Sequence, residues 1–324
     1  MEYLLGVDGG GSKTIGILMD INGELKAVAT SGPVNLAENG EKMVRENVRR
    51  LRSLLNRVSP SDIIYSSFGM PAFGEWRKAD QEYRTILVEE LGITPTLLVN
   101  DVVVGWAAGT LGEDGIHVVA GTGTIAYGRH GKKEARVSGW GSIIGDEGSA
   151  YALGQEALRR ISRQFDGREL PTLLKELFCQ RLRWTSWQDL TEWIYSHQDA
   201  ERRTVIAALA PVVYEAGQKG DPVAREIMDN AAQELSLCAK TLIRLLSLPR
   251  PLVTYSGSVL TKNEIVRQRF MNDLYQSIPQ ATVKESELHP ALGAIILLYR
   301  EIYGVLPQIL LPKLSLVSQQ FFSE

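Results

Sequence analysis

The chain has 324 residues, of which 44% are hydrophobic and 23% charged, an ordinary composition for a globular protein. The formal net charge of -3 offers no basic excess for nucleic acid, and no apolar run approaches the roughly 20 residues of a membrane-spanning helix. The N-terminal MEYLLGVDGG also lacks the basic start of a signal peptide. We therefore expect a cytoplasmic protein of about two domains with no nucleic-acid or membrane partner.

The N-terminal residues predict a β-meander. The expected strands are Tyr3–Val7, Thr14–Asp20 and Glu24–Thr30. The stretch DGGGSKT, residues 8–14, joins the first two strands, and Asn22-Gly23 is a hairpin signal between the next two. A Walker A loop has Gly-Lys-Ser/Thr after four spacer residues and leads from a strand into a helix. Here Ser12 separates Gly11 from Lys13, and the loop leads into a strand, so we exclude a Walker A loop.

DGGGSKT nevertheless has the residue types of a phosphate-binding turn. Glycine N–H groups bind anions because no side chain blocks the approach. Ser12 and Thr14 add hydroxyl groups, and Lys13 adds a positive charge. Asp8 would repel a phosphate unless a cation lay between them, which points to Mg²⁺ held by carboxylate, phosphate and water. A plain hairpin turn is the alternative.

A second polar candidate follows a later strand. The expected elements here are a helix at Glu38–Val58, a strand at Asp62–Met70, a helix at Ala79–Leu91, a strand at Pro95–Val99 and a helix at Val102–Gly109. Asn100-Asp101 lies at the carboxyl end of a strand, where α/β sheets bind their ligands. Asp101 could accept a proton from a hydroxyl nucleophile there. A simple helix cap is the alternative reading of both residues.

The strand pattern then repeats. The expected strands are Ile116–Ala120, Ile125–His130 and Glu134–Ser138, with the loop GTGT, residues 121–124, between the first two. Two copies of a strand, glycine-hydroxyl loop, strand, turn and strand unit predict a duplicated architecture. We expect two α/β domains that face each other across a cleft, so that the two loops approach one ligand from both sides.

The stretch GWGSIIGDEGSA, residues 139–150, combines four glycines, a tryptophan and two acids before a helix. Trp140 offers a flat apolar face for a sugar ring, and Asp146 could bind hydroxyls or a magnesium-bound water. The alternative is a capped loop with a core tryptophan.

The rest of the chain is mainly helical. The expected helices are Ser149–Phe165, Leu170–Arg181, Trp187–Ser196, Arg202–Lys219, Asp221–Leu248, Val259–Ser277 and Pro290–Tyr303, with strands at Pro251–Tyr255 and Ala281–Lys284. YSGSV, residues 255–259, could contact a base or ribose, or be a plain turn. We expect a first domain at 1–114 with helix 290–304 packing back on it, a second domain with a helical insertion at 115–289, and a largely irregular tail at 305–324.

These stretches, in this order, resemble the superfamily of sugar kinases, heat-shock chaperone ATPases and actin. They more closely resemble the BadF/BadG type of ATPase, the group that holds N-acetylglucosamine kinase. DGGGSKT is similar to its first phosphate loop, VND to its central acid, AGTGT to its second phosphate loop, and GWGSIIGDEGSA to its most specific signature. SGSV resembles the adenosine motif and HPALGA the closing helix. The resemblance implies an α/β fold of two ribonuclease H-like domains flanking a central nucleotide and sugar cleft.

The resemblance also implies residue roles. Asp8 would hold Mg²⁺ through water, and Asp101 would be the catalytic base. The ATP-binding residues would be Gly10, Gly11, Ser12, Lys13 and Thr14 in the first loop, Gly121, Thr122 and Gly123 in the second, and Gly217, Gly257 and Ser258 near the adenosine. The sugar-binding residues would be Asn35, Asp101, Gly139, Trp140, Gly141 and Asp146. The family further implies a homodimer.

The expected function is therefore an ATP- and Mg²⁺-dependent kinase that phosphorylates an amino sugar, N-acetylglucosamine at its 6-hydroxyl in the first place. Kinases for glucosamine, N-acetylmuramic acid or another sugar remain open, because one sequence does not reveal the pocket. An ATP-hydrolysing activator or switch is disfavoured, because Cys179 and Cys238 do not match the paired iron–sulfur cysteines of dehydratase activators. Both phosphate loops and Asp101 argue against a non-catalytic sugar sensor.

Overall fold

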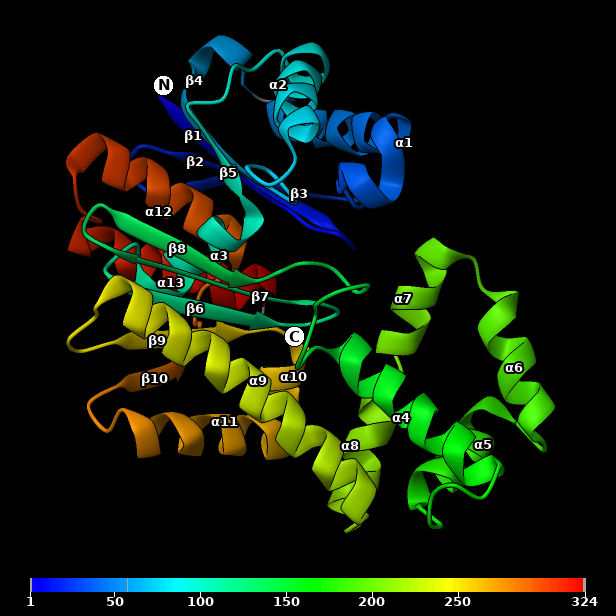
Figure 1. Cartoon of the computed structure of the whole chain (residues 1–324). Helices are drawn as coiled ribbons and strands as arrows, with labels where there is room; N and C mark the ends of the chain where they lie inside the picture. The colour runs from blue at the N-terminus through cyan, green and yellow to red at the C-terminus, as the bar shows by residue number, and fades with distance from the viewer. Residues whose placement is uncertain (1, 57, 323–324) are drawn as a thin grey trace. The chain divides into compact units, whose positions relative to one another are not determined.

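The computed structural model describes residues 2–56 and 58–322 (Figure 1). The chain forms two compact units. Unit 1 runs to Asp114 and resumes at Ser286, and unit 2 is the continuous segment Gly115–Glu285. Among the described residues, no helix has the length and apolar character needed to cross a membrane.

The sheet of unit 1 has five strands in the order β3-β2-β1-β4-β5. The strands are β1 (Tyr3–Gly9), β2 (Thr14–Asp20), β3 (Leu25–Ser31), β4 (Ile63–Met70) and β5 (Leu97–Asn100). The first three are antiparallel, and β4 and β5 run parallel to β1. DGGGSKT is the hairpin between β1 and β2, with Gly9 opposite Thr14. The prediction of a strand-to-strand loop is therefore confirmed.

The sheet of unit 2 has the order β10-β9-β6-β7-β8. Its strands are β6 (Gly115–Ala120), β7 (Thr124–His130), β8 (Lys133–Ser138), β9 (Leu252–Ser256) and β10 (Thr282–Glu285). Read from its other end, the order repeats that of unit 1: an antiparallel meander followed by two parallel strands. The duplicated α/β architecture expected from the repeated strand pattern is confirmed, in the ribonuclease H-like form that the family resemblance implies.

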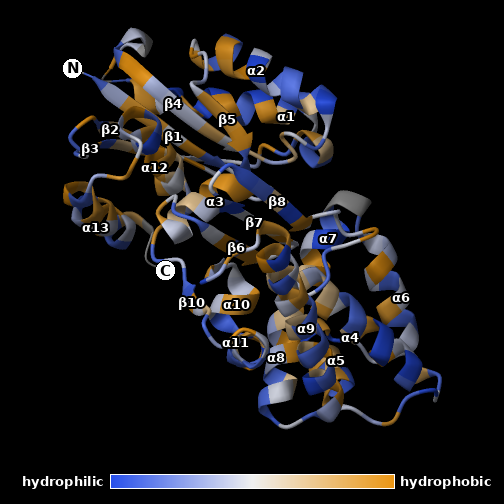
Figure 2. Cartoon of the chain, turned by 60° about the vertical axis from the view of Figure 1, so that its left-hand side comes forward, coloured by the Kyte–Doolittle hydropathy of each residue, from blue (hydrophilic) through white to orange (hydrophobic). Residues whose placement is uncertain are grey.

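Helices cover both faces of the unit 1 sheet. They are α1 (Leu36–Arg50), α2 (Arg77–Leu91), α3 (Asp101–Thr110), α12 (Pro290–Tyr303) and α13 (Leu311–Phe322), with short 3₁₀ turns η1 (Leu51–Leu55), η2 (Pro60–Asp62) and η3 (Gln308–Leu310). Because side chains alternate along β1, Leu5 and Val7 pack with α1 and α2, whereas Leu4 packs with α12 and α13. In Figure 2, α1 is mainly hydrophilic in colour.

The helices of unit 2 form one large core with its sheet. They are α4 (Ala150–Phe165), α5 (Leu173–Leu182), α6 (Trp187–Ser196), α7 (Asp199–Ala207), α8 (Ala210–Gln218), α9 (Pro222–Leu246), α10 (Ser258–Lys262) and α11 (Glu264–Ser277). Two expected helices are each broken in two. Pro211 lies in the first turn of α8 and lacks the N–H that a continuous helix requires. Asn263 leaves helical geometry, and its side chain caps α11.

The expectation of a largely irregular tail is wrong. Pro312 falls in the first turn of α13, where a missing N–H costs nothing, so the proline is compatible with a helix. Leu310, Leu314 and Val317 are buried against unit 1. Lys313 Nζ donates to the carbonyl of Asn22 at 2.8 Å, which joins the tail to the β2–β3 turn. The tail is therefore part of the core of unit 1.

Close backbone contacts at two glycines fix α3. A Cβ on Gly69 of β4 would lie 2.6 Å from Cγ2 of Val104. A Cβ on Gly293 of α12 would collide with the carbonyl oxygen of Val104 and lie 2.8 Å from the amide of Ala108. Since α3 begins at Asp101, the position of this carboxylate depends on both contacts.

The packing of α13 predicts a difference between two leucines. Leu314→Ala removes a fully buried side chain and should lower the free energy of unfolding by about 2–5 kcal/mol. Leu316 on the same helix is 52% exposed, so Leu316→Ala should change stability by about 0.5 kcal/mol or less. Urea denaturation of both variants measures the difference. Equal effects would show that α13 does not pack through Leu314.

Candidate functional site

The carboxyl ends of β1, β4 and β5 form one edge of the unit 1 sheet, because these strands are parallel. Asp8 lies near the end of β1, and Asp101 follows β5 directly as the first residue of α3. The side chain of Asn100 accepts from the amide of Val102 at 3.1 Å and caps this helix. Asn100 is therefore the cap residue of α3, and the Asp101 carboxyl also accepts backbone hydrogen bonds from Val102 and from its own amide.

Asp8 and Asp101 are electrostatically coupled. Burial and the charge of Asp101 raise the pKa of Asp8 to about 7, and Lys13 opposes this shift. Burial also raises the pKa of Asp101 to about 7, and the Glu75 carboxylate contributes in the same direction. Two desolvated carboxylates at one sheet edge favour a nearby cation or a proton.

The residues around Asp8 suit a magnesium ion that is held by one carboxylate together with phosphate and water. In the described part of the chain, no three His, Cys, Asp or Glu side chains gather into a protein-built metal site. Mg²⁺ commonly uses one or two carboxylates and completes its shell with phosphate and water. Asp8, beside the exposed end of a phosphate-type loop, offers such a carboxylate.

The first glycine loop exposes only part of its predicted binding residues. Gly11, Ser12 and Lys13 are exposed, and Gly10 donates its N–H to the carbonyl of Lys13 at 2.9 Å. Thr14 is 1% exposed, and its hydroxyl donates to the carbonyl of Gly32 at 2.8 Å. Thr14 therefore braces the loop from below, whereas the three exposed residues form its accessible surface.

The second glycine loop lies on the start of α4. The amide of Ala150 donates to the carbonyl of Gly121 at 2.8 Å, and the amide of Tyr151 donates to the carbonyl of Thr122 at 3.3 Å. Gly257 also touches this loop: its φ is +88°, and a Cβ there would clash with the carbonyl of Ala120 and lie 2.8 Å from the amide of Gly121. The structure thus brings GTGT and SGSV together.

Asp146 locks the signature stretch onto the same loop. Its backbone has a φ of +64°, and the residue is 2% exposed. One carboxylate oxygen accepts from the amide of Thr124 at 3.1 Å, and the other is 2.8 Å from Nη2 of Arg203. A Cβ on Gly123 would clash with Arg203 Nη2 and lie 2.7 Å from Asp146 Oδ1, so a side chain at position 123 would require Arg203 or Asp146 to move.

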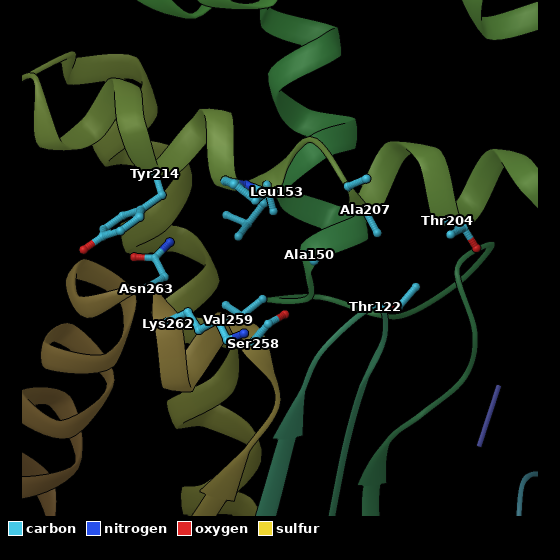
Figure 3. A pocket seen from close by; sticks show the side chains of 13 residues that line it. Thr122, Ala150, Leu153, Thr204, Ala207, Tyr214, Ser258, Val259, Lys262 and Asn263 are labelled. Atoms are coloured by element: carbon cyan, nitrogen blue, oxygen red, sulfur yellow. The ribbon is translucent and has the colours of Figure 1, made fainter. Parts of the chain in front are cut away.

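A cavity of about 360 Å³ opens beside the second loop, wholly within unit 2. Its walls come from Thr122, Ala150, Leu153, Thr204, Ala207, Ala208, Ala210, Pro211, Tyr214, Ser258, Val259, Lys262 and Asn263. Figure 3 shows Tyr214 and Asn263 at one end, and Thr122 and Thr204 at the other. The cavity therefore runs from a mixed aromatic and amide end to a glycine loop.

The remaining predicted residues lie elsewhere. Trp140 is 65% exposed, and the guanidinium of Arg136 lies 4.8 Å from its ring centroid. The neighbouring Gly139 and Gly141 have φ values of +79° and +80°. Asn35 caps α1, and Gly217 packs against Met228 rather than lining the cavity. The core-tryptophan alternative for the signature stretch is wrong, because the ring is exposed.

Comparison with known proteins identifies the family. The model of the BadF/BadG/BcrA/BcrD ATPase family matches residues 5–297. The chain belongs to this family. An N-acetylmuramic acid/N-acetylglucosamine kinase of Clostridium acetobutylicum is 31% identical over 302 residues, which cover 92% of this chain and 98% of that protein. An N-acetyl-D-glucosamine kinase of Dictyostelium discoideum is 28% identical, over 91% of this chain and 97% of that protein.

Solved structures share the fold of this family member. A candidate N-acetylglucosamine kinase of Chromobacterium violaceum superimposes with a TM-score of 0.73 at 23% identity, over 92% of this chain and 99% of that one. A ROK family glucokinase of Streptomyces griseus, solved with glucose and AMPPNP, gives a TM-score of 0.54 at 17% identity, over 91% and 97% of the two chains. At these identities the likeness establishes the fold alone.

Sequence patterns missed several residues of the two sites. Tyr83 donates its hydroxyl to the carbonyls of Val34 and Pro71 at 2.7 and 3.0 Å, and so ties together two loops at the sheet edge. Glu75 accepts from the side chain of Asn100 at 3.0 Å and lies close enough to influence Asp101. Arg203 comes from a distant helix. None of them belongs to a motif, so only the folded chain reveals their positions.

The contact at Gly257 predicts a difference in stability between two glycine-to-alanine variants. Gly257→Ala should destabilise unit 2 by about 1–3 kcal/mol beyond the control, because the new Cβ meets backbone atoms of the second loop. Gly220→Ala is the control, since Gly220 has a φ of +90° and a Cβ there would have no other atom within 4 Å. Thermal or urea denaturation compares the two. Equal losses would mean that positive φ alone, without the clash, determines the cost.

Proposed function

We propose that this member of the family is an ATP-dependent amino-sugar kinase, with N-acetylglucosamine as acceptor and its 6-hydroxyl as the attacking group. The main support is the pairing of Asp8 and Asp101 at one sheet edge, beside a loop that exposes Gly11, Ser12 and Lys13. The amino-sugar kinases among its full-length relatives support the substrate class.

In this proposal Asp101 is the general base. It follows β5 at the sheet edge, and the cap of α3 is provided by Asn100 instead. Its pKa, raised to about 7 by burial, suits proton transfer near neutral pH. Asp101 would accept the proton of the sugar hydroxyl as that oxygen attacks the γ-phosphorus and the bond to the β-phosphate oxygen breaks. Phosphoryl transfer requires mainly such positioning together with charge stabilisation.

Each glycine loop has its own proposed phosphate-binding residues. Gly10, Gly11, Ser12 and Lys13 of the first loop, and Gly121, Thr122 and Gly123 of the second, supply N–H groups, hydroxyls and one cation. Asp8 would hold Mg²⁺ through water. When bound, this ion would neutralise phosphate charge.

The cavity of unit 2 suits the nucleoside of ATP. Its volume of about 360 Å³ lies within the range of small-molecule sites. Tyr214 and Asn263 provide an aromatic surface and an amide at one end, and Thr122 of the glycine loop lies at the other. Ser258, together with the backbone of Gly257, would contact the adenosine. Gly217 lies on the same helix as Tyr214 and would act by allowing close packing.

The proposed sugar-binding residues are Asn35 and Asp101 in unit 1 and those of the signature stretch in unit 2. The exposed ring of Trp140, held under Arg136, offers an apolar surface to a pyranose face. Gly139 and Gly141 allow the turn on each side of the ring through their positive φ angles. Asp146 is buried, so it would act mainly by fixing this stretch.

The decisive experiment measures ADP release over N-acetylglucosamine, glucosamine, N-acetylmuramic acid and glucose. We expect the highest kcat/KM with N-acetylglucosamine, and a product phosphorylated at the 6-position by NMR. Two relatives named for N-acetylmuramic acid and glucosamine kinases make those sugars the informative comparisons. Sugar-independent ATP hydrolysis without any phosphorylated sugar would refute the proposal and favour a switch protein.

Replacing the base should separate chemistry from binding. Asp101→Asn keeps the shape of the side chain but removes the proton acceptor, so kcat should fall by about 10²–10⁴-fold. Sugar binding should remain measurable by calorimetry. A variant with near-normal kcat would rule out Asp101 as the base.

Replacing Asp8 should instead change the response to metal. Asp8→Asn removes the charge that would attract the hydrated ion. The magnesium concentration for half-maximal turnover should rise, while the sugar affinity stays close to that of the wild type. An unchanged magnesium dependence would place the ion elsewhere.

A further inference from the structure

The two glycine loops differ in one respect that the sequence leaves unexplained. The first loop, DGGGSKT, contains its own cation, Lys13, whereas the second, GTGT at residues 121–124, contains no Lys or Arg. In the structure, the guanidinium of Arg203 lies beside the second loop. Arg203 belongs to α7, about eighty residues further along the chain.

Arg203 packs directly on the second loop. The absence of a side chain at Gly123 makes room for Nη2 of Arg203. Nη2 lies 2.8 Å from Oδ2 of Asp146, whose other oxygen accepts from the amide of Thr124. One buried carboxylate thus fixes both the arginine and the backbone of the loop.

The residue next to Arg203 in α7 borders the cavity of unit 2. Thr204 lines the cavity of unit 2 and lies with Thr122 at the same end of it, opposite Tyr214 (Figure 3). The side chain of Arg203 is 25% exposed, whereas that of Asp146 is 3% exposed. Arg203 itself does not line the cavity, but its guanidinium lies beside Gly123, in the same loop whose Thr122 does line it.

We propose that Arg203 is a phosphate-binding residue of the nucleotide site, and that Asp146 is a positioning residue that holds it against the second glycine loop. Arg203 would take the place in the second loop that Lys13 takes in the first. The inference rests on the proposed function only in that the cavity binds a nucleotide, and it does not depend on which sugar is phosphorylated.

Physical chemistry favours this division of roles. A guanidinium has five N–H donors in a planar fork that suits phosphate oxygens, so it can contact a phosphate while one nitrogen stays with Asp146. Holding the side chain in advance reduces the entropy lost on binding. The ion pair with Asp146 also lowers the cost of keeping a partly buried charge before the ligand arrives.

Direct binding measurements test the proposal without any sugar. Adenosine, AMP, ADP and ATP are titrated into the wild type and Arg203→Gln in magnesium-containing buffer, and binding is followed by calorimetry. We expect Arg203→Gln to weaken ATP binding by about ten- to a hundredfold, the loss of a charge-assisted hydrogen bond. Adenosine binding should be unchanged, because the nucleoside end of the cavity is intact.

Other variants separate charge, position and stability. Arg203→Lys keeps the charge and should retain part of the ATP affinity. Asp146→Asn should weaken ATP binding in the same direction as Arg203→Gln, because the arginine loses its anchor. Arg159→Gln is the control for loss of one charge, since Arg159 is exposed on α4 and pairs with Glu156 outside the cavity.

The outcomes distinguish this inference from the proposed function. If ATP binding depends on Arg203 and no sugar is phosphorylated, the inference stands and the kinase assignment fails. If sugars are phosphorylated and Arg203→Gln binds every nucleotide like the wild type, the inference is overturned and the kinase assignment stands. Lys262 is a cation of the cavity wall. If Lys262→Gln weakens ATP binding but not adenosine binding, and Arg203→Gln does not, the inference is also overturned. Equal weakening of adenosine and ATP would show a structural role only.

Discussion

The close packing of α3 between β4 and α12 is the constraint on which the site of unit 1 depends. Gly69 and Gly293 allow backbone and side-chain atoms around Val104 to approach within distances that any Cβ would prevent. The helix therefore has no freedom to slide, and its first residue, Asp101, is held at the sheet edge near Asp8. Desolvation of both carboxylates raises the pKa of each.

The two units use one architecture for different purposes. Unit 1 combines a meander with coupled carboxylates and an exposed glycine loop that has its own lysine. Unit 2 combines the same meander with a helical insertion, α5 to α8, that supplies much of the cavity wall and Arg203. The insertion thus gives unit 2 a cavity, whereas unit 1 has the acidic edge.

The sequence was sufficient for the repeated part of the fold and insufficient where contacts are distant. Alternating apolar residues and glycine loops predicted both meanders, because strand pairing there is local. Pro211 was a readable signal for the break between α7 and α8, but amphipathic periodicity across it masked the break. The prolines of the tail led to the wrong prediction of an irregular segment, since Pro312 suits the start of a helix. The glycine loops and Asp101 were recognisable as candidates, whereas Arg203 and Glu75 depend on packing that no short motif encodes.

The chain path of unit 1 has a consequence for biosynthesis. Its sheet is complete once residue 100 has been made, but α12 and α13, which pack on one face of that sheet, are synthesised after unit 2. Unit 2 is a continuous segment and has all its residues available earlier. While unit 2 is being made, the sheet face that carries Leu4 and Ile17 therefore still lacks α12 and α13. Chaperones that bind apolar strands would find their target in this interval rather than in the finished protein.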